Sequence, residues 1–301
     1  MKNLRQIAIL ASFFCIWLTS YIHGEYEIIL SFFLILSFGI LHGSNDIFLI
    51  SKIWESGPLT SYGRVLSFYV VFVLLALGLF YFAPIVALSI FILCSAYHFG
   101  EQHWENDFTL VEGIWKRFFY LLYGMFILSL LFWLKNEEVN EVVVAISGYD
   151  VSEAFISYVF YSDLIVLVPL WLFLIVRDNI VRKQVLAELF YLVIFTIIFK
   201  VSSLIWGFAI YFVFWHSLPS LYDQIYFLNN RVDKKGVWDY WKMALPFWLI
   251  SVIGIVALYY VFKDLEIFYA LFFSFLAAVT FPHSIAIHKM FKTRNSKNDR
   301  I

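Results

Sequence analysis

The sequence predicts an all-α, polytopic integral membrane protein with about eight to ten transmembrane helices in a single bundle. Of its 301 residues, 62% are hydrophobic and only 14% are charged, whereas soluble domains have roughly 45–50% apolar and about a quarter charged residues. The formal net charge of −1 excludes a nucleic-acid-binding protein that relies on a strongly basic surface. Because a helix needs about 20 apolar residues to cross a bilayer, the apolar residues suffice for about ten spans.

Apolar runs mark the expected spans along the chain. The first run begins at Ile7, after Lys2 and Arg5, and no small-residue cleavage site follows it, so we interpret it as a span and not as a signal peptide. Little polar sequence separates the runs that flank Pro84 and Lys200, and merging there would leave eight or nine spans. The expected spans are residues 7–22, 27–50, 64–82, 84–100, 114–134, 154–176, 184–200, 202–221, 243–262 and 266–288, and the longest polar connections are 101–113, 135–153 and 222–242.

The distribution of charge predicts the orientation. Lys and Arg favour the cytoplasmic side of a membrane, and they are enriched at the N-terminus, in the 222–242 connection and in the last residues. The 135–153 connection is acidic and is expected outside. We therefore expect a multi-pass protein of the cell (inner) membrane with both termini cytoplasmic. It would consist of one transmembrane helical domain over residues 1–290 and a basic cytoplasmic tail over 291–301.

Four of the seven histidines fall within expected spans, each in a small polar cluster and each towards the cytoplasmic side, while His288 lies at the edge of the last span. A histidine in a span is costly and indicates a functional site by default, although any one alone could simply hydrogen-bond a neighbouring helix. We expect His23 to be solvated, and we favour His103 and His288 less as ligands. The four intramembrane histidines are His42, His98, His216 and His283.

The histidines and nearby carboxylates suggest a metal site. Asp46 and Glu101 follow His42 and His98 by four and three residues, and on a helix this spacing would let each carboxylate orient a ring. Several neutral imidazoles suit a divalent ion such as iron, copper or zinc. With an open coordination position such a site could bind O₂ at Fe(II), which points to oxygenase chemistry on a lipid-soluble substrate.

The clusters, in this order, resemble the Brp/Blh family of bacterial and archaeal β-carotene dioxygenases. The segments that carry the resemblance are His42-Gly43 with Asp46, His98-Phe99-Gly100, Trp215-His216-Ser217 and Pro282-His283, and together they extend over about residues 35–290.

The resemblance implies a non-haem Fe(II) enzyme that uses O₂ to cleave β-carotene, or a related carotenoid, at its central double bond. The product would be retinal, and a rhodopsin that receives it is the expected protein partner, alongside membrane lipid and without nucleic acid. The implied catalytic residues are His42, His98 and His216, with His283 as a further metal ligand, Asp46 and Glu101 as orienting carboxylates, and Tyr97, Phe99 and Trp215 lining the substrate.

One position departs from the family pattern, which has a second histidine four residues after that of Trp-His-Ser. Here that residue is Ser220, whose hydroxyl is a poor iron ligand. Either His283 completes the ligand set, or three histidines hold the metal, or the site has lost it.

Other functions stay open from the sequence. A carotenoid-binding or transport protein could use the same site without catalysis, and two histidines could ligate a haem. A di-iron desaturase is disfavoured, because the chain has no His-x-x-His-His box and too few histidines.

Overall fold

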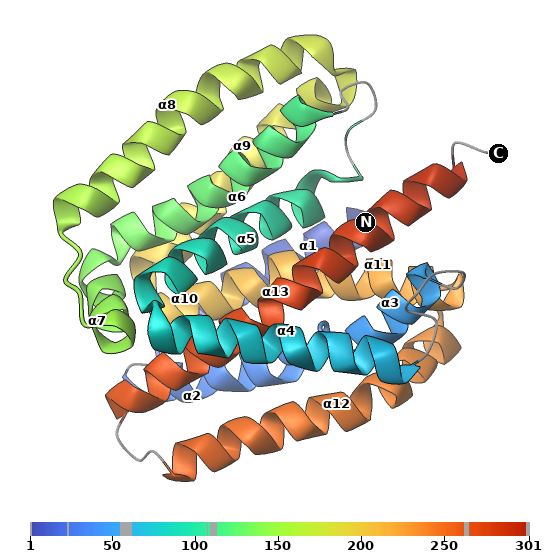
Figure 1. The fold of residues 1–301 in the computed structure, drawn as a ribbon. Coiled ribbons are helices and arrows are strands. Elements are labelled where there is room, and N and C mark those ends of the chain that lie inside the picture. Colours follow the sequence, from blue (N-terminus) through green and yellow to red (C-terminus); the bar gives the residue numbers. More distant parts are fainter. Residues whose placement is uncertain are drawn as a thin grey trace. The chain divides into compact units, whose positions relative to one another are not determined.

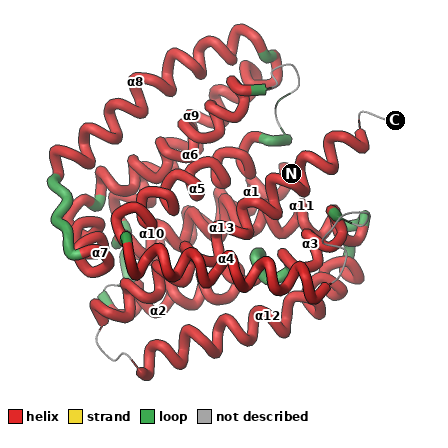
Figure 2. The backbone as a smooth tube through the Cα atoms, in the orientation of Figure 1, coloured by secondary structure: helices red, strands yellow, loops and turns green. Residues whose placement is uncertain are grey.

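A computed structural model describes residues 2–22, 24–54, 62–106, 108, 113–261 and 265–298. Helices dominate the described ranges, and these ranges contain no strand (Figure 2). The all-α class is therefore confirmed. So is the polytopic membrane class, since eight helices within these ranges are long and apolar enough to cross a membrane. They span Gly63–Phe82, Pro84–Trp104, Ile114–Leu134, Glu153–Arg177, Asn179–Val201, Leu204–Asn229, Lys234–Val261 and Leu271–Arg294.

The chain divides into two compact units, each assembled from segments that are far apart in sequence. Unit 1 comprises Met1–Ile35, Ser95–Val144 and Tyr149–Pro219. Unit 2 comprises Leu36–Cys94, Ala145–Gly148 and Ser220–Ile301. Helix α5 (Pro84–Trp104) belongs to unit 2 in its first part and to unit 1 in its second.

Unit 1 is held together by helix pairs. The elements that lie wholly or mostly in unit 1 are α1 (Lys2–Thr19), α2 (Glu25–Leu34), α6 (Ile114–Leu134), α7 (Asn136–Ser147), α8 (Glu153–Arg177), α9 (Asn179–Val201), α10 (Leu204–Ile210) and the π-helix η2 (Tyr211–Ser217). Helix α6 packs against α8 and α9, α10 packs against α2, and α1 packs against α9 and η2.

Side-chain caps fix where three of these helices begin. Ser152, Asp178 and Ser203 precede α8, α9 and α10, and each accepts a hydrogen bond from a backbone N–H of the first turn. Such caps satisfy donors that the helix itself leaves without a partner. They explain why polar residues between apolar runs end one span and begin the next.

Two glycines allow α5 and α6 to approach closely within unit 1. A Cβ atom on Gly100 would collide with the backbone of Tyr120, and one on Gly124 would collide with the backbone of Ala96. Small residues at helix interfaces are typical of membrane proteins, because they let the backbones approach. Gly100 therefore allows the part of α5 that carries His98 to pack directly on the backbone of α6.

Unit 2 is organised around its C-terminal helix. The elements that lie wholly or mostly in unit 2 are η1 (Ile35–Gly39), α3 (Asp46–Ile53), α4 (Tyr62–Phe82), α11 (Leu218–Asn229), α12 (Lys234–Val261) and α13 (Leu265–Asn298). Figure 1 shows α13 beside α4, and α13 also packs against α3 and α12. One buried cluster combines Phe80 and Phe281 with small residues, namely Ala76, Ala87, Ala277 and Ala278.

The expected continuous span over residues 27–50 is wrong. The helix passes through the π-helix η1 and ends after Leu41, and residues 42–45 form turns before α3 starts at Asp46. Gly, Ser and Asn at positions 43–45 are poor helix formers, and Ser44 hydrogen-bonds back to the carbonyl of Ile40 at 2.8 Å.

The predicted connections also need correction. The 135–153 segment is largely helix α7, and α11 continues to Asn229 through the start of the expected 222–242 connection. The spans that flank Pro84 do not merge, since α4 ends at Phe82 and α5 begins at Pro84, a favoured first residue. Those beside Lys200 also stay separate, because Ser202 and Ser203 interrupt the helix. His23 lies outside the described residues, and the single domain and the cytoplasmic tail stay predictions.

Candidate metal-binding histidines

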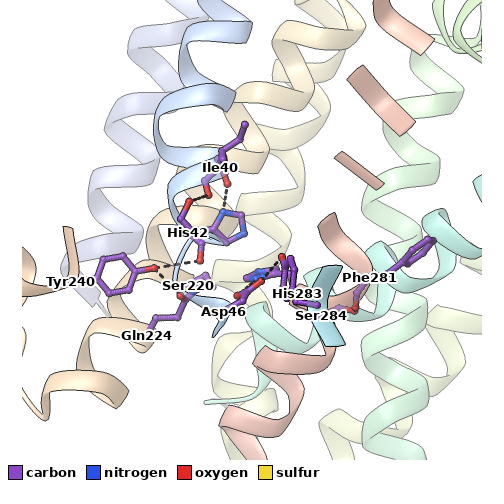
Figure 3. A network of polar contacts seen from close by, with 12 residues as sticks. Ile40, His42, Asp46, Ser220, Gln224, Tyr240, Phe281, His283 and Ser284 are labelled. Atoms are coloured by element: carbon purple, nitrogen blue, oxygen red, sulfur yellow. Dashed lines mark hydrogen bonds and ion pairs between the residues drawn. The ribbon is translucent and has the colours of Figure 1, made fainter. Parts of the chain in front are cut away.

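Unit 2 brings together two histidines that are distant in sequence. His42 lies in the turn after η1 and His283 lies on α13, and Figure 3 shows both side chains together with Asp46. Their ring centroids are 4.6 Å apart with an edge-to-face angle of 89°, and their candidate ligand nitrogens lie within 4.8 Å of each other. Both side chains are buried, at 4% and 3% exposure. They form a pair of imidazoles away from solvent, which is the setting in which a metal ion is held.

Both rings of this pair are oriented through Nδ1. The Nδ1 atom of His42 contacts the carbonyl oxygen of Gly39, and Nδ1 of His283 lies 2.8 Å from Oδ1 of Asp46. A carbonyl or an ionised carboxylate can only accept, so Nδ1 carries the proton and Nε2 presents the lone pair in each neutral ring. This arrangement is characteristic of metal-bound histidines.

Asp46 pairs with a different histidine from the one that its spacing predicts. The expected one-turn contact with His42 requires a continuous helix, and the turns at residues 42–45 remove it. Asp46 instead contacts His283, and its other oxygen accepts a hydrogen bond from the hydroxyl of Tyr69 at 3.1 Å. The carboxylate is 1% exposed and is held on both sides. Its position is therefore fixed, which suits a group that orients a ligand.

Unit 1 contains the second histidine pair. His98 on α5 and His216 in η2 have ring centroids 4.6 Å apart at an angle of 80°, and each is 1% exposed. The Phe99 ring centroid lies 4.5 Å from that of His216, and the ring of Phe212 stacks on His216 at 5.6 Å and 16°. This pair is thus enclosed by aromatic rings and shielded from water.

The π-helix η2 places His216. Its wider turns are uncommon and occur frequently at functional sites, and the carbonyl of Phe212 accepts a hydrogen bond from Ser217 Oγ at 2.8 Å. The other π-helix, η1, ends three residues before His42. Each unit therefore has an irregular helix next to a candidate ligand.

The remaining predicted residues have defined neighbours. Glu101 is buried and accepts a hydrogen bond from the hydroxyl of Tyr97 at 3.3 Å. Trp215 donates to Ser12 Oγ at 2.9 Å, and its ring lies 4.7 Å from that of Phe195. The orienting role of Glu101 and the substrate-lining roles of Tyr97, Phe99 and Trp215 stay predictions.

Sequence reasoning missed a buried carboxylate in unit 1. Glu188 on α9 lies 2.8 Å from Nε2 of His103, accepts a hydrogen bond from Tyr123 at 2.9 Å, and has Arg5 at 3.8 Å. A charge inside an apolar run is a signal for function or pairing, and Glu188 had this signal. Its contact gives His103 a buried carboxylate partner.

Sequence reasoning also missed the hydrogen bonds that connect Ser220, Gln224 and Tyr240 in unit 2. Ser220 is fully buried and accepts a hydrogen bond from Gln224 at 3.0 Å, and Gln224 accepts one from Tyr240 at 2.8 Å. Gln224 lies four residues after Ser220, a spacing that was visible in the sequence. Its hydrogen bond with Tyr240 on α12 could not be predicted from the sequence.

Comparison with models of known protein families gives a match over most of the chain. A family model described as β-carotene 15,15′-dioxygenase matches residues 33–291, a range that contains all four buried histidines. No curated protein and no solved structure gave a significant match.

Proposed function

Because the chain belongs to the β-carotene 15,15′-dioxygenase family, we propose that it is an iron-dependent dioxygenase that cleaves β-carotene, or a related carotenoid, at the central double bond. The C=C bond breaks, one oxygen atom of O₂ goes to each fragment, and β-carotene yields two molecules of retinal. The enzyme would act in the cell (inner) membrane with both termini cytoplasmic, and a rhodopsin would be the natural receiver of the product.

The proposed ligands of a single Fe(II) ion are His42, His98, His216 and His283. The observation that carries this assignment is the contact of His283 with Asp46, because a carboxylate on Nδ1 directs Nε2 towards a metal. The carbonyl of Gly39 orients the ring of His42 in the same way, because it also contacts Nδ1 and leaves Nε2 for the metal. With His283 in the set, four imidazoles are available even though Ser220 offers only a hydroxyl.

The bound iron would supply the binding and activation of O₂. The chain's own residues have three tasks. Asp46 and the carbonyl of Gly39 hold the protons on Nδ1 of His283 and His42. Phe99 and Phe212 enclose His216 with apolar surface, which excludes water and suits a polyene. Tyr97 and Trp215 would complete the lining, and the substrate would enter from the bilayer.

Iron content of purified variants tests the ligand assignment. We expect one iron per chain, and we expect each single change His42→Ala, His98→Ala, His216→Ala or His283→Ala to lower bound iron and abolish cleavage without preventing membrane insertion. His288→Ala, on the same helix as His283, is the matched control and should keep its iron.

Stoichiometry distinguishes one site from two. If each pair bound its own ion, the protein would carry two irons per chain, and loss of one pair would leave one of them in place. That result would overturn the single-site proposal. Full iron and full activity in any one histidine variant would remove that residue from the ligand set.

A further inference from the structure

A chain of buried side chains in unit 2 connects α11 and α12 to the turn that carries His42 (Figure 3). The amide of Gln224 links two partners, since its Nε2 donates to Ser220 Oγ at 3.0 Å and its Oε1 accepts from the hydroxyl of Tyr240 at 2.8 Å. The same hydroxyl lies 3.4 Å from the carbonyl oxygen of His42, so its single proton is shared between this carbonyl and the closer Oε1 of Gln224. The connection thus runs from Ser220 to the backbone of a proposed ligand.

A second contact holds the other end of this turn. Asn45 Nδ2 donates to the backbone carbonyl of Tyr240 at 3.0 Å. Residues 42 and 45 therefore both contact Tyr240, one through its side chain and one through its backbone. Ser220, Gln224 and Asn45 are fully buried, and Tyr240 is 2% exposed, so water does not compete for these hydrogen bonds.

The turn needs such external support. Its own backbone hydrogen bonds are short-range, from Gly43 to Ile40 at 3.1 Å, from Ser44 to Leu41 at 3.2 Å and from Asp46 to Gly43 at 3.3 Å. A regular helix would fix the position of His42 through successive bonds between residues four apart. The last bond of this kind runs from the amide of His42 to the carbonyl of Phe38 at 3.3 Å, and the ladder ends there. Contacts with neighbouring helices therefore help to hold the turn that follows.

We propose that Gln224 and Tyr240 are positioning residues that hold the His42 turn in its metal-binding geometry, and that Ser220 anchors the amide of Gln224 and is not a ligand. This inference rests on the proposed role of His42 as a metal ligand. In this proposal the hydroxyl of Ser220 fixes the orientation of the Gln224 amide, so that Oε1 of Gln224 can accept a hydrogen bond from Tyr240. A residue that cannot accept from Gln224 at this position would release the whole connection.

The test measures metal affinity and fold stability separately. We would titrate the metal-free full-length protein in detergent with Co(II) under anaerobic conditions, follow the visible absorption of the bound ion, and record thermal unfolding by circular dichroism. Tyr240→Phe removes one oxygen atom, Gln224→Leu removes both amide contacts, and Ser220→Ala removes the anchor. Ser129→Ala is the matched control, because Ser129 is also buried and, among the described residues, its hydroxyl donates to the carbonyl of Phe126 in its own helix.

We expect the three variants to bind Co(II) about 10-fold more weakly, at the lower end of the range known for residues that orient metal ligands. Ser129→Ala should leave the Co(II) dissociation constant unchanged. Because the residues act through one connection, Tyr240→Phe combined with Gln224→Leu should weaken binding no more than the stronger single change. Ser220→His should also weaken binding, since the larger ring does not fit this fully buried position without displacing the amide of Gln224.

Two outcomes would overturn the inference. One is an unchanged Co(II) dissociation constant in Tyr240→Phe and Gln224→Leu, whether or not the midpoint of unfolding falls, because the network would then be only structural. The other is tighter Co(II) binding in Ser220→His. His42→Ala separates this inference from the proposed function: wild-type Co(II) affinity in that variant would remove His42 from the site and the proposed ligand set would fail instead.

Discussion

Contacts at Nδ1 decide which nitrogen of His42 and of His283 would face a bound metal. The clearest case is the pair of Asp46 and His283, which are 237 residues apart in sequence and 2.8 Å apart in the structure. The sequence identified both residues as candidates, but it could not pair them. Local spacing instead connected Asp46 with His42, because the pattern of apolar residues gives no sign that the helix stops between them.

Changing the charge of Asp46 tests its role at this scale. Asp46→Asn keeps the shape of the side chain but provides a weaker acceptor for Nδ1 of His283, so metal affinity should fall by about 10- to 100-fold. Asp163→Asn is the control, since Asp163 is a buried carboxylate on α8 that contacts no histidine in the described structure. Anaerobic Co(II) titration of both variants measures the effect. Equal affinity in Asp46→Asn and the wild type would show that the contact does not orient a ligand.

At the scale of elements, irregular helix geometry and close packing place the histidines. Apolar runs predicted most helices well, because a bilayer-length run leaves few alternatives. They failed at residues 42–45, where Gly, Ser and Asn end a helix inside an apolar environment. They also failed at α7, because its acidic residues led us to expect a polar connection there. The segment is a helix that buries Val139 and Val143, one turn apart. The π-helices have no signature in the apolar pattern, since both lie within otherwise ordinary runs.

The close packing of α5 on α6 gives a prediction at this scale. Gly100→Ala would push a methyl group into the backbone of Tyr120, and since a backbone cannot rotate away, the helices must separate or shift. We expect a loss of stability of about 1–3 kcal/mol or more, and weaker metal binding because His98 lies two residues away on the same helix.

Thermal unfolding and Co(II) titration of the same preparation measure both effects. Gly78→Ala on α4 is the matched control, because a Cβ atom there meets no atom within 4 Å, and it should behave as the wild type. Wild-type stability of Gly100→Ala would contradict the assigned helix contact.

For the whole molecule, composition alone predicts the class. With 62% hydrophobic residues and eight long apolar helices in its described part, the chain has the character of a multi-pass membrane protein. The division into two units could not be predicted, because each unit combines segments from separate parts of the chain. Contacts of this kind depend on side-chain fit between distant helices, which local periodicity does not encode.

The orientation in the membrane is a prediction at this scale. The excess of Lys and Arg at both ends predicts cytoplasmic termini. A fluorescent protein fused after Ile301 should therefore fluoresce in a bacterial host, and alkaline phosphatase fused at the same point should be inactive. Active phosphatase together with a dark fluorescent fusion would reverse the assigned orientation.

The most direct test of the central claim is pigment analysis in a bacterium that produces β-carotene. The full chain would be expressed there beside a His98→Ala variant, with membrane insertion verified for both, and retinal and residual β-carotene would be quantified by chromatography. We predict that retinal appears and β-carotene falls only with the intact protein. Unchanged β-carotene and no retinal, from a protein that is inserted and carries iron, would contradict central cleavage of this substrate.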